Sequence, residues 1–359
     1  MLGATAPSSP PAPADGTAGP TVTWSVRAGD SLQVLPTLPT ASVDAIVCDP
    51  PYGIDFQGQA WDGRSIRAAA RDHAGRRLSA SEAFERWATA WALECARVLK
   101  PGGHFAAFGA PRTFHRLVSG LEDAGLEIRD VLLWLYGTGM PKSRRLPGGQ
   151  ATALKPAYEP ILLARKPPLG SIERNLQAHG TGALNVDACR VEGRWPANVV
   201  LSHAPCCGDG CCEPTCAVAL IDAAAGDARV AYAARRPVSR LFYCPKATRH
   251  ERNAGCEHLP HQRLDLFPTA TGAAYTPPTA PNAHPTVKPL ALMRWLVRLA
   301  TPPGGTVLDP FCGSGSTGCA AVLEDRRFLG IERDEQYAAV ARARIAHWTQ
   351  AVRSSEAPR

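Results

Sequence analysis

The amino-acid sequence predicts an α/β fold with a doubly wound, mostly parallel sheet that is interrupted by an irregular insertion. Strand-like apolar runs alternate with amphipathic helical runs near both ends of the chain, the order that builds parallel sheets with helices on both faces. Between residues 137 and 281, glycine, proline and short apolar runs alternate, with few clear helical stretches. A chain of 359 residues is long enough for one such domain with an insertion, or for two domains.

The first alternating region opens with "VDAIVC", residues 43–48, a run of small and β-branched apolar residues that predicts a buried strand. Residues 81–99 carry aromatic and aliphatic side chains at helical spacing. Ser79 or Ser81 could cap this helix, and Gly102-Gly103 would stop it. Two more strands and the helix between them are expected at 104–109, 128–137 and 112–125.

The second alternating region begins with a helix in "PLALMRWLVRLA". Its pattern then predicts, in order, a strand at 305–309, a helix at 316–325, a strand at 326–332 and a helix at 334–348. Trp87 and Trp91 in the first region fit the apolar face of their helix, so we expect them in the core rather than against a ligand.

These patterns divide the chain into five parts. We expect a disordered tail at 1–22, because its Pro, Ala and Ser bias cannot bury a core. The other parts are a first half of the sheet domain at 23–136, an insertion at 137–281, a second half at 282–350 and a short tail at 351–359.

Composition excludes several classes of protein. Apolar residues make up 45% and charged residues 20% of the chain, which is ordinary for a globular protein. No apolar run approaches the roughly 18 residues that a membrane span needs. The first residues lack a positive segment followed by an apolar one, so no signal peptide is expected and the protein is predicted to be cytoplasmic.

The net charge of +7 is unevenly distributed. Between residues 140 and 270 there are 17 Lys and Arg against 11 Asp and Glu, so nearly the whole excess lies in the insertion. A basic insertion in an otherwise balanced chain indicates a polyanionic partner such as nucleic acid. An ordinary solvated surface is the alternative interpretation of the same charges.

The strand at 43–48 ends in Asp49, Pro50, Pro51 and Tyr52. Two consecutive prolines remove two backbone donors and fix two φ angles, so this tip is rigid, acidic and aromatic. A stiff turn whose tyrosine packs on the core is the structural alternative to a functional site.

A second special tip, "VLDPFCGSGSTG", lies at 307–318. Gly313, Gly315 and Gly318 have the G-x-G-x-x-G spacing of nucleotide-binding turns, and Glu332 ends the next strand, where an acid can bond ribose hydroxyls. A plain strand-to-helix turn or an NAD site are the alternatives; the missing Gly-Lys-Ser/Thr argues against an ATP-binding loop. Because ligands bind outside the carboxyl ends of parallel strands, both tips should face one crevice.

Together, "DPPYG" and "DPFCGSGST" resemble the signature pair of the amino-methylating DNA methyltransferases, which use S-adenosylmethionine. The order of the two motifs resembles that of the circularly permuted β group. "AGDSLQVLPTLP" and "HPTVKP" are similar to cofactor-flanking segments of this family, and the resemblance covers about residues 24–135 and 282–347. It implies the class I S-adenosylmethionine-dependent methyltransferase fold, and stretches such as "ALKPAYEPILLARKP" are similar to phage and bacterial members.

The resemblance implies a catalytic and a cofactor-binding set. In the catalytic tip, Asp49 and the Pro50 carbonyl would accept the two protons of an exocyclic amine, Pro51 would add rigidity, and Tyr52 would stack on a flipped base. The residues implied to bind the cofactor come from four segments: Asp30, Lys288, Asp309, Phe311, Gly313, Ser314, Gly315, Ser316, Thr317 and Glu332. Asp309 could instead cap its turn, and Asp30 and Lys288 could be ordinary surface residues.

Five of the twelve cysteines lie within residues 206–216. In a reducing cytoplasm such a cluster is more typical of a metal site than of disulfides. His203, Cys207, Cys211 and Cys216 form a candidate set for structural zinc, with Cys206 and Cys212 as substitutes, and reduced thiols are the alternative.

The insertion lies where the family places its target-recognition region, so we expect double-stranded DNA as partner. Its candidate DNA contacts are Lys142, Arg144, Arg145, Arg190, Arg194, Arg235, Arg236, Arg240, Lys246, Arg249 and Arg252. Aspartate at the head of the tetrapeptide favours adenine N6 as the methylated atom. Cytosine N4, methylation of RNA or a protein glutamine, and a non-catalytic zinc-stapled DNA-binding module stay as alternatives, and a homodimer is left open.

Overall fold

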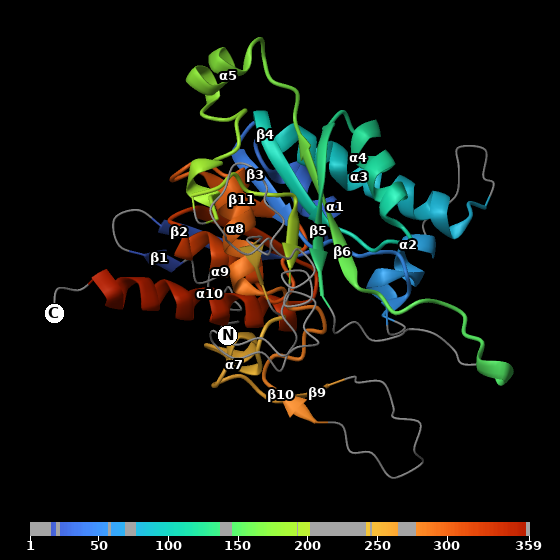
Figure 1. Ribbon diagram of the computed structural model, residues 1–359. Coiled ribbons are helices and arrows are strands. Elements are labelled where there is room, and N and C mark those ends of the chain that lie inside the picture. Colours follow the sequence, from blue (N-terminus) through green and yellow to red (C-terminus); the bar gives the residue numbers. More distant parts are fainter. Residues whose placement is uncertain are drawn as a thin grey trace, which may run out of the picture.

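Figure 1 shows the computed structural model of the protein. The structure describes residues 16–18, 22–56, 59–68, 77–136, 146–191, 193–201, 242–244, 246–264 and 278–356. Statements about elements and contacts below refer to these residues. Within them, no helix is both long and apolar enough to cross a membrane.

Ten strands form one sheet in the order β1-β2-β12-β11-β3-β4-β6-β5-β7-β8. Neighbours run parallel except in the pairs β1/β2, β4/β6 and β5/β6, so the predicted mostly parallel sheet is confirmed. The strands are β1 (Gly16–Ala18), β2 (Val22–Ala28), β3 (Val43–Cys48), β4 (Leu99–Phe108), β5 (Glu127–Leu135), β6 (Tyr158–Arg165), β7 (Val199–Leu201), β8 (Phe242–Tyr243), β11 (Thr306–Asp309) and β12 (Arg327–Glu332).

The pairing of β11 with β3 determines where the two special tips lie. Val307 is opposite Ala45 and Leu308 is opposite Ile46, in parallel register. The two strands are separated by more than 250 residues of sequence, yet their carboxyl ends finish side by side. Asp49 and Pro310, the residues that follow them, therefore begin neighbouring loops at one edge of the sheet.

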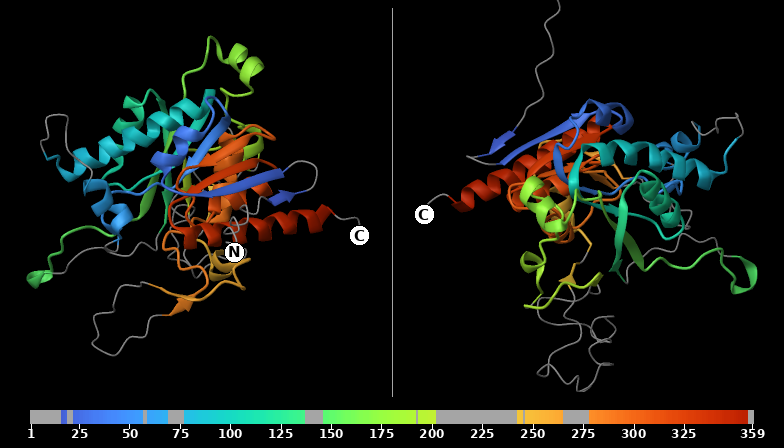
Figure 2. Two further views of the ribbon diagram at one scale, coloured as in Figure 1. Left: turned by 180° about the vertical axis from the view of Figure 1, so that it is seen from behind. Right: turned by 90° about the horizontal axis from the view of Figure 1, so that it is seen from above.

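Helices cover both faces of the sheet (Figure 2). On one face lie α1 (Ser31–Val34), α3 (Ala80–Val98) and α4 (Phe114–Asp123); on the other lie α8 (Leu290–Ala300), α9 (Ser316–Leu323) and α10 (Glu335–Glu356). Strand β3 is buried along its whole length because alternate residues serve the two cores: Ala45 and Val47 face α8, and Ile46 and Cys48 face α3.

Helix α3 begins as its sequence predicts. Ser79 is the N-cap and accepts a hydrogen bond from the Glu82 amide, and the Glu82 carboxylate accepts one from the Ser79 amide in return. The end differs from the prediction: the helix stops at Val98 and β4 begins at once, so Gly102-Gly103 lies inside the strand. At Gly103 a Cβ would approach the Asp44 carbonyl to 2.9 Å, so the glycine permits close strand contact.

The range 137–281 is not wholly separate from the sheet. Strand β6, in "YEPILLAR", lies between β4 and β5 and is antiparallel to both, with Ile161, Leu162 and Ala164 fully buried. Its flanking prolines hid this strand from the sequence pattern, although the apolar run itself is typical of a buried strand.

Both predicted tails also contain regular structure. Strand β1, within the tail expected to be disordered, pairs antiparallel with β2, because β2 is otherwise an edge strand with open hydrogen-bonding groups. Helix α10 continues through residue 356, past the expected boundary at 350, because no helix-breaking residue interrupts it there.

The other elements are short. They are the 3-10 helices Leu35–Thr37, Ala60–Asp62, Pro147–Gly149 and Asp187–Cys189, helices α2 (Arg64–Ala68), α5 (Ile172–His179) and α7 (Arg249–Asn253), and the hairpin of β9 (Gln262–Arg263) and β10 (Thr279–Ala280). Helix α7 is fastened to the sheet domain: the Leu290 amide donates to the Glu251 carboxylate, and the Asn282 amide nitrogen donates to the Arg252 carbonyl at 2.6 Å.

Candidate active site

A cavity of about 610 Å³ opens at the carboxyl ends of β3, β11 and β12. It brings Asp49 together with Phe311 and Gly313, as the sequence predicts for two tips at one crevice. Eleven of the predicted site residues line it: Asp30, Asp49, Pro51, Lys288, Asp309, Phe311, Gly313, Ser314, Ser316, Thr317 and Glu332. Pro50, Tyr52 and Gly315 are not among its lining residues.

The loop after β3 is held by the buried carboxylate of Asp62. Its Oδ1 accepts from the amides of Tyr52 and Gly53, and its Oδ2 accepts from the amides of Ile54 and Phe56 at 3.2 and 2.7 Å. Burial raises the pKa of Asp62, while these backbone hydrogen bonds lower it in part. The tip therefore owes its rigidity to a charged clamp as well as to its two prolines, and the sequence analysis missed this clamp.

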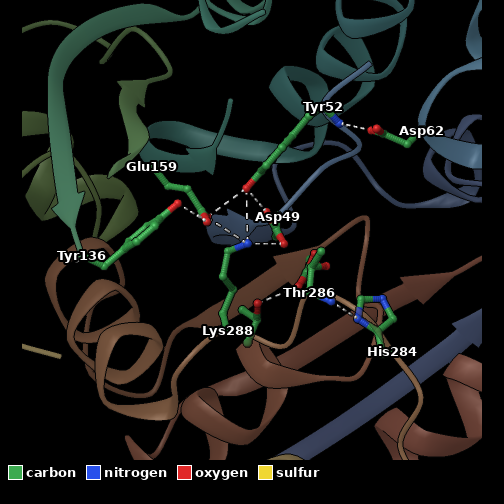
Figure 3. A network of polar contacts seen from close by, with 10 residues as sticks. Asp49, Tyr52, Asp62, Tyr136, Glu159, His284, Thr286 and Lys288 are labelled. Atoms are coloured by element: carbon green, nitrogen blue, oxygen red, sulfur yellow. Dashed lines mark hydrogen bonds and ion pairs between the residues drawn. The ribbon is translucent and has the colours of Figure 1, made fainter. Parts of the chain in front are cut away.

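Asp49 belongs to a network of five polar side chains (Figure 3). The Tyr52 hydroxyl donates to Asp49 Oδ1 at 2.6 Å, and Lys288 Nζ donates to Asp49 Oδ2 at 2.6 Å. Glu159 on β6 completes it: its Oε2 lies 3.2 Å from both Lys288 Nζ and the Tyr52 hydroxyl. The Tyr136 hydroxyl donates to Glu159 Oε1 at 3.2 Å. Sequence reasoning found Asp49, Tyr52 and Lys288 but missed Glu159.

Burial changes the proton affinities of this network. It raises the pKa of Asp49, although the ammonium of Lys288 opposes the rise. Burial alone would lower the pKa of Lys288, but the carboxylates of Asp49 and Glu159 outweigh it, so this pKa is raised. Burial and the same two carboxylates raise the pKa of Tyr52, which is therefore a protonated donor at neutral pH.

The glycine loop after β11 is held from two sides. The Glu332 carboxylate accepts from the Gly313 amide at 2.7 Å and from the Asp334 amide at 2.8 Å. On the other side the fully buried guanidinium of Arg344 donates to the Ser314 carbonyl at 2.6 Å and to the hydroxyls of Ser314 and Ser316. Gly313 has φ +52, and a Cβ there would approach His284 Nε2 to 2.7 Å, so only glycine fits this wall of the cavity.

Comparison with known proteins identifies the family that carries this arrangement. The family model of the N6/N4 DNA methylases, described as DNA methylase, matches residues 43–343. The chain belongs to the DNA methylase family.

Two curated DNA methylases and one solved structure illustrate the likeness. Type II methyltransferase M.HindIII of Haemophilus influenzae is 25% identical over 346 residues, which cover 85% of this chain and 89% of that protein. M.HinfI of Haemophilus influenzae is 21% identical, covering 88% and 67%. The structure of the PvuII DNA methyltransferase, which is cytosine-N4-specific, matches with 14% identity and a TM-score of 0.56 over 94% of both chains, and confirms the predicted fold class.

In this DNA methylase Gly315 serves the packing of two helices. It has φ +79, and a Cβ there would lie 2.9 Å from the Ala341 Cα of α10. This glycine therefore permits close approach of α9 to α10, and contact of its backbone with a cofactor stays a prediction. The third glycine of the motif, Gly318, is similar, since its Cβ would meet Ile345 and Phe328.

The carboxylates of Asp309 and Asp30 each accept a hydrogen bond from the backbone amide two residues later. Asp309 accepts from the Phe311 amide at 3.0 Å and from the Thr317 hydroxyl at 2.6 Å, so the turn-capping alternative describes its contacts. Its complete burial raises its pKa to about 7. Asp30 caps α1 through the Leu32 amide at 2.9 Å. Both side chains nevertheless line the cavity.

Aromatic side chains form one wall of the cavity. The Phe311 ring lies edge-on to Trp91 at 5.0 Å and 5.6 Å from Trp87, measured between ring centroids. Trp91 is fully buried as predicted, yet both tryptophans also line the cavity, as do Trp61 and Tyr337. The sequence analysis placed Trp87 and Trp91 in the core alone, because helical spacing cannot show which end of an apolar face meets a ligand.

The zinc prediction concerns residues that the structure leaves undescribed. His203, Cys207, Cys211 and Cys216, with Cys206 and Cys212, fall in 202–241, outside the described residues. Among the described residues no group of three or more His, Cys, Asp or Glu side chains could hold a metal ion. Lys142, Arg144, Arg145, Arg235, Arg236 and Arg240 of the predicted DNA contacts also lie outside the described ranges.

Proposed function

We propose that this DNA methylase transfers a methyl group from S-adenosylmethionine to N6 of an adenine that is flipped out of duplex DNA. One observation carries the proposal: the Asp49 carboxylate and the Gly313 loop, from opposite ends of the chain, line one cavity. A carboxylate suited to an amine thus lies beside a pocket suited to a nucleoside.

The residues of the cavity fit S-adenosylmethionine. Its volume is within the roughly 300–1,000 Å³ of small-molecule sites. Glu332 ends β12, where its carboxylate can accept from ribose hydroxyls, and the rings of Phe311, Trp87 and Tyr337 offer apolar surface to an adenine. When bound, S-adenosylmethionine supplies a methyl group on a positively charged sulfur.

Asp49 would prepare the amine for the transfer. The lone pair of an exocyclic amine is conjugated with the base, so the nitrogen is a weak nucleophile. A carboxylate has about four acceptor positions, and Tyr52 and Lys288 use two of those on Asp49. The others, with the Pro50 carbonyl, can accept the amine protons and draw the nitrogen towards a tetrahedral form. Because Asp62 and Tyr52 hold these acceptors beforehand, little reorganisation is needed during the reaction.

The roles proposed for Lys288 and Tyr52 differ in part from those that the sequence predicts. Lys288 was expected against the cofactor; it lines the cavity, but its ammonium bonds Asp49. The Tyr52 hydroxyl also bonds Asp49, so we propose that Tyr52 orients this carboxylate and presents its ring to the flipped base.

The basic residues of 137–281 would contact the DNA. Arg190, which pairs with Asp187 at 2.7 Å, and Lys246, which lies 4.0 Å from the centroid of the Tyr136 ring, are exposed, and this supports such contacts. Arg252 has a different setting, since it donates to the His284 carbonyl at 2.7 Å and fastens α7 to the cavity wall.

We include in the proposal a site-specific enzyme, a cytoplasmic location, a homodimer and a structural zinc in 202–241.

Methyl transfer to DNA tests the proposal directly. Purified protein, labelled S-adenosylmethionine and long unmethylated duplex DNA of mixed sequence should give labelled DNA, and digestion to nucleosides should give N6-methyladenine. N4-methylcytosine in place of N6-methyladenine would show that cytosine is the methylated base. Label in RNA or protein alone would show that DNA is not the substrate. Binding of DNA with no transfer would favour the non-catalytic DNA-binding module. Sequencing the modified positions would then reveal the recognised site.

A further inference from the structure

Lys288 lies between two carboxylates that belong to different loops and strands (Figure 3). Its Nζ is 2.6 Å from Asp49 Oδ2 and 3.2 Å from Glu159 Oε2, and its side chain is only 7% exposed. Glu159 is not one of the described residues that line the cavity. It contacts Lys288 and Tyr52, and its charge also acts through space on Asp49.

The charges of these groups have opposite consequences for methyl transfer. The transfer places positive charge on the amine nitrogen, and a negative Asp49 stabilises that charge. An ammonium in contact with the same carboxylate opposes it, and a buried charge is only weakly screened. With Glu159 present, two carboxylates and one ammonium leave one net negative charge at the site. Without Glu159 the remaining pair is neutral.

We propose that Glu159 is a positioning residue for methyl transfer: it holds Lys288 and offsets its charge, so that the site around an ionised Asp49 keeps the net negative charge that stabilises the reacting amine. This inference rests on the proposed function. Strand β6 lies between β4 and β5, and from there its Glu159 side chain reaches Tyr52 in the loop after β3.

Glu159→Gln tests the charge with the size nearly unchanged. In single-turnover experiments with enzyme in excess, we expect the rate of transfer to fall by roughly 10²-fold, as for loss of one preorganised electrostatic group. S-adenosylmethionine affinity, measured by calorimetry, should stay unchanged because Glu159 is remote from the cofactor side. Glu122→Gln, the same change of charge at an exposed position of α4, is the matched control, and its rate should change little. A wild-type rate for Glu159→Gln overturns the proposal.

A double variant separates charge balance from simple packing. Lys288→Met removes the ammonium that Glu159 offsets. Glu159→Gln with Lys288→Met therefore restores the single negative charge of Asp49, and its rate should recover at least tenfold relative to Glu159→Gln alone. If Glu159→Gln fails to fold, the double variant, which is uncharged at both positions, still tests the proposal. It should then transfer methyl groups far faster than Asp49→Ala. A double variant as slow as Glu159→Gln or Asp49→Ala contradicts the proposal.

The pH dependence gives a third readout. The titratable groups that face Asp49 are Tyr52 on its own loop, Lys288 before α8, Glu159 on β6, and the buried Asp309 and Cys48. Asp49 must be ionised to accept the amine protons, so activity falls as the pH drops through its pKa. The negative Glu159 raises that pKa. Glu159→Gln should therefore move the acid limb of the rate profile to lower pH even though the maximum rate is lower. An acid limb that stays in place or moves to higher pH contradicts the role.

The two levels of proposal fail in different ways. If wild-type protein transfers no methyl group to DNA, the proposed function fails. The role of Glu159 alone fails if the wild-type protein is active but Glu159→Gln keeps the wild-type rate and the wild-type acid limb. It also fails alone if the wild-type protein is active and the double variant shows no recovery of rate.

Discussion

The loop after β3 is held by the buried carboxylate of Asp62, whereas the loop after β11 is held by the carboxylate of Glu332 and by the buried guanidinium of Arg344. Asp62 accepts hydrogen bonds from four backbone amides between Tyr52 and Phe56. Arg344 donates to the Ser314 carbonyl and to the hydroxyls of Ser314 and Ser316. An anion therefore binds donors of the first loop, and a cation binds acceptors of the second.

This difference matches what each loop offers to the cavity. With its amides bound to Asp62, the first loop presents the Asp49 carboxylate to the cavity, and this acceptor suits an amine. The second loop, held through its oxygens by Arg344, lies at the start of α9, where backbone donors gather. Asp62 thus binds donors of the first loop and leaves the Asp49 carboxylate as an acceptor for the ligand. In the second loop Arg344 binds acceptors, while Glu332 binds the Gly313 amide.

Asp49→Ala should abolish methyl transfer, by about 10³-fold or more, because the main acceptor for the amine is lost. S-adenosylmethionine affinity should be nearly unchanged, since the second loop is untouched. Single-turnover transfer and calorimetry measure the two effects. Asp49→Asn keeps an oxygen acceptor without the charge, so its rate of methyl transfer should lie between those of the wild type and Asp49→Ala. Full activity of Asp49→Ala would remove the proposed mechanism.

Arg344→Met should destabilise the protein by about 3–4 kcal/mol, because buried carbonyl and hydroxyl groups lose a charged donor. It should also weaken S-adenosylmethionine binding about tenfold or more, because Ser314, Ser316 and Thr317 form part of the cavity wall. Denaturant unfolding and calorimetry test this. Arg342→Met on the same helix is the control, since Arg342 bonds Glu335 and the Val26 carbonyl but not the loop. Equal effects of the two substitutions would contradict a specific clamp.

Asp62→Asn should cost about 1–3 kcal/mol of stability, because one oxygen can no longer serve two amides. The transfer rate should fall about tenfold as the tip loosens, with cofactor affinity unchanged. Arg344→Met differs, because there we expect the affinity for S-adenosylmethionine to fall. Asp123→Asn, at an exposed position in α4, is the control. If Asp62→Asn weakened the cofactor as much as Arg344→Met, the two clamps would not be separate.

Much of the fold and of the site could be predicted because the information is contiguous in the sequence. Asp49 to Tyr52 and the segment around Gly313 are short motifs that follow apolar strands, and the rule for parallel sheets places them together. Asp62, Glu159 and Arg344 could not be predicted in this way. Glu159 and Arg344 act on atoms distant in sequence, and Asp62 acts on amides of a nearby irregular loop. Nothing in the sequence around each of these three residues distinguishes it from a solvated surface charge.

Glycine 315 shows the same limit within a motif. Its spacing predicted a cofactor contact, and the structure shows that the position of a Cβ at this residue is occupied by α10. The pattern of glycines reports that the backbone approaches something closely. It does not report whether that neighbour is a ligand or a helix.

Gly315→Ala should therefore act on stability more than on direct contact with the cofactor. Two costs combine: a residue with a Cβ is strained at φ +79, and this Cβ would lie 2.9 Å from the Ala341 Cα. Gly180→Ala is a matched control, because Gly180 has φ +72 with nothing within 4 Å of the added Cβ. We expect about 1 kcal/mol for Gly180→Ala, and about 1–3 kcal/mol more for Gly315→Ala, as for overpacked interiors. Denaturant unfolding of both variants isolates the packing cost by subtraction. Equal losses of stability would mean that α9 and α10 can separate at little cost, and Gly315 would then again be a candidate for contact with the cofactor.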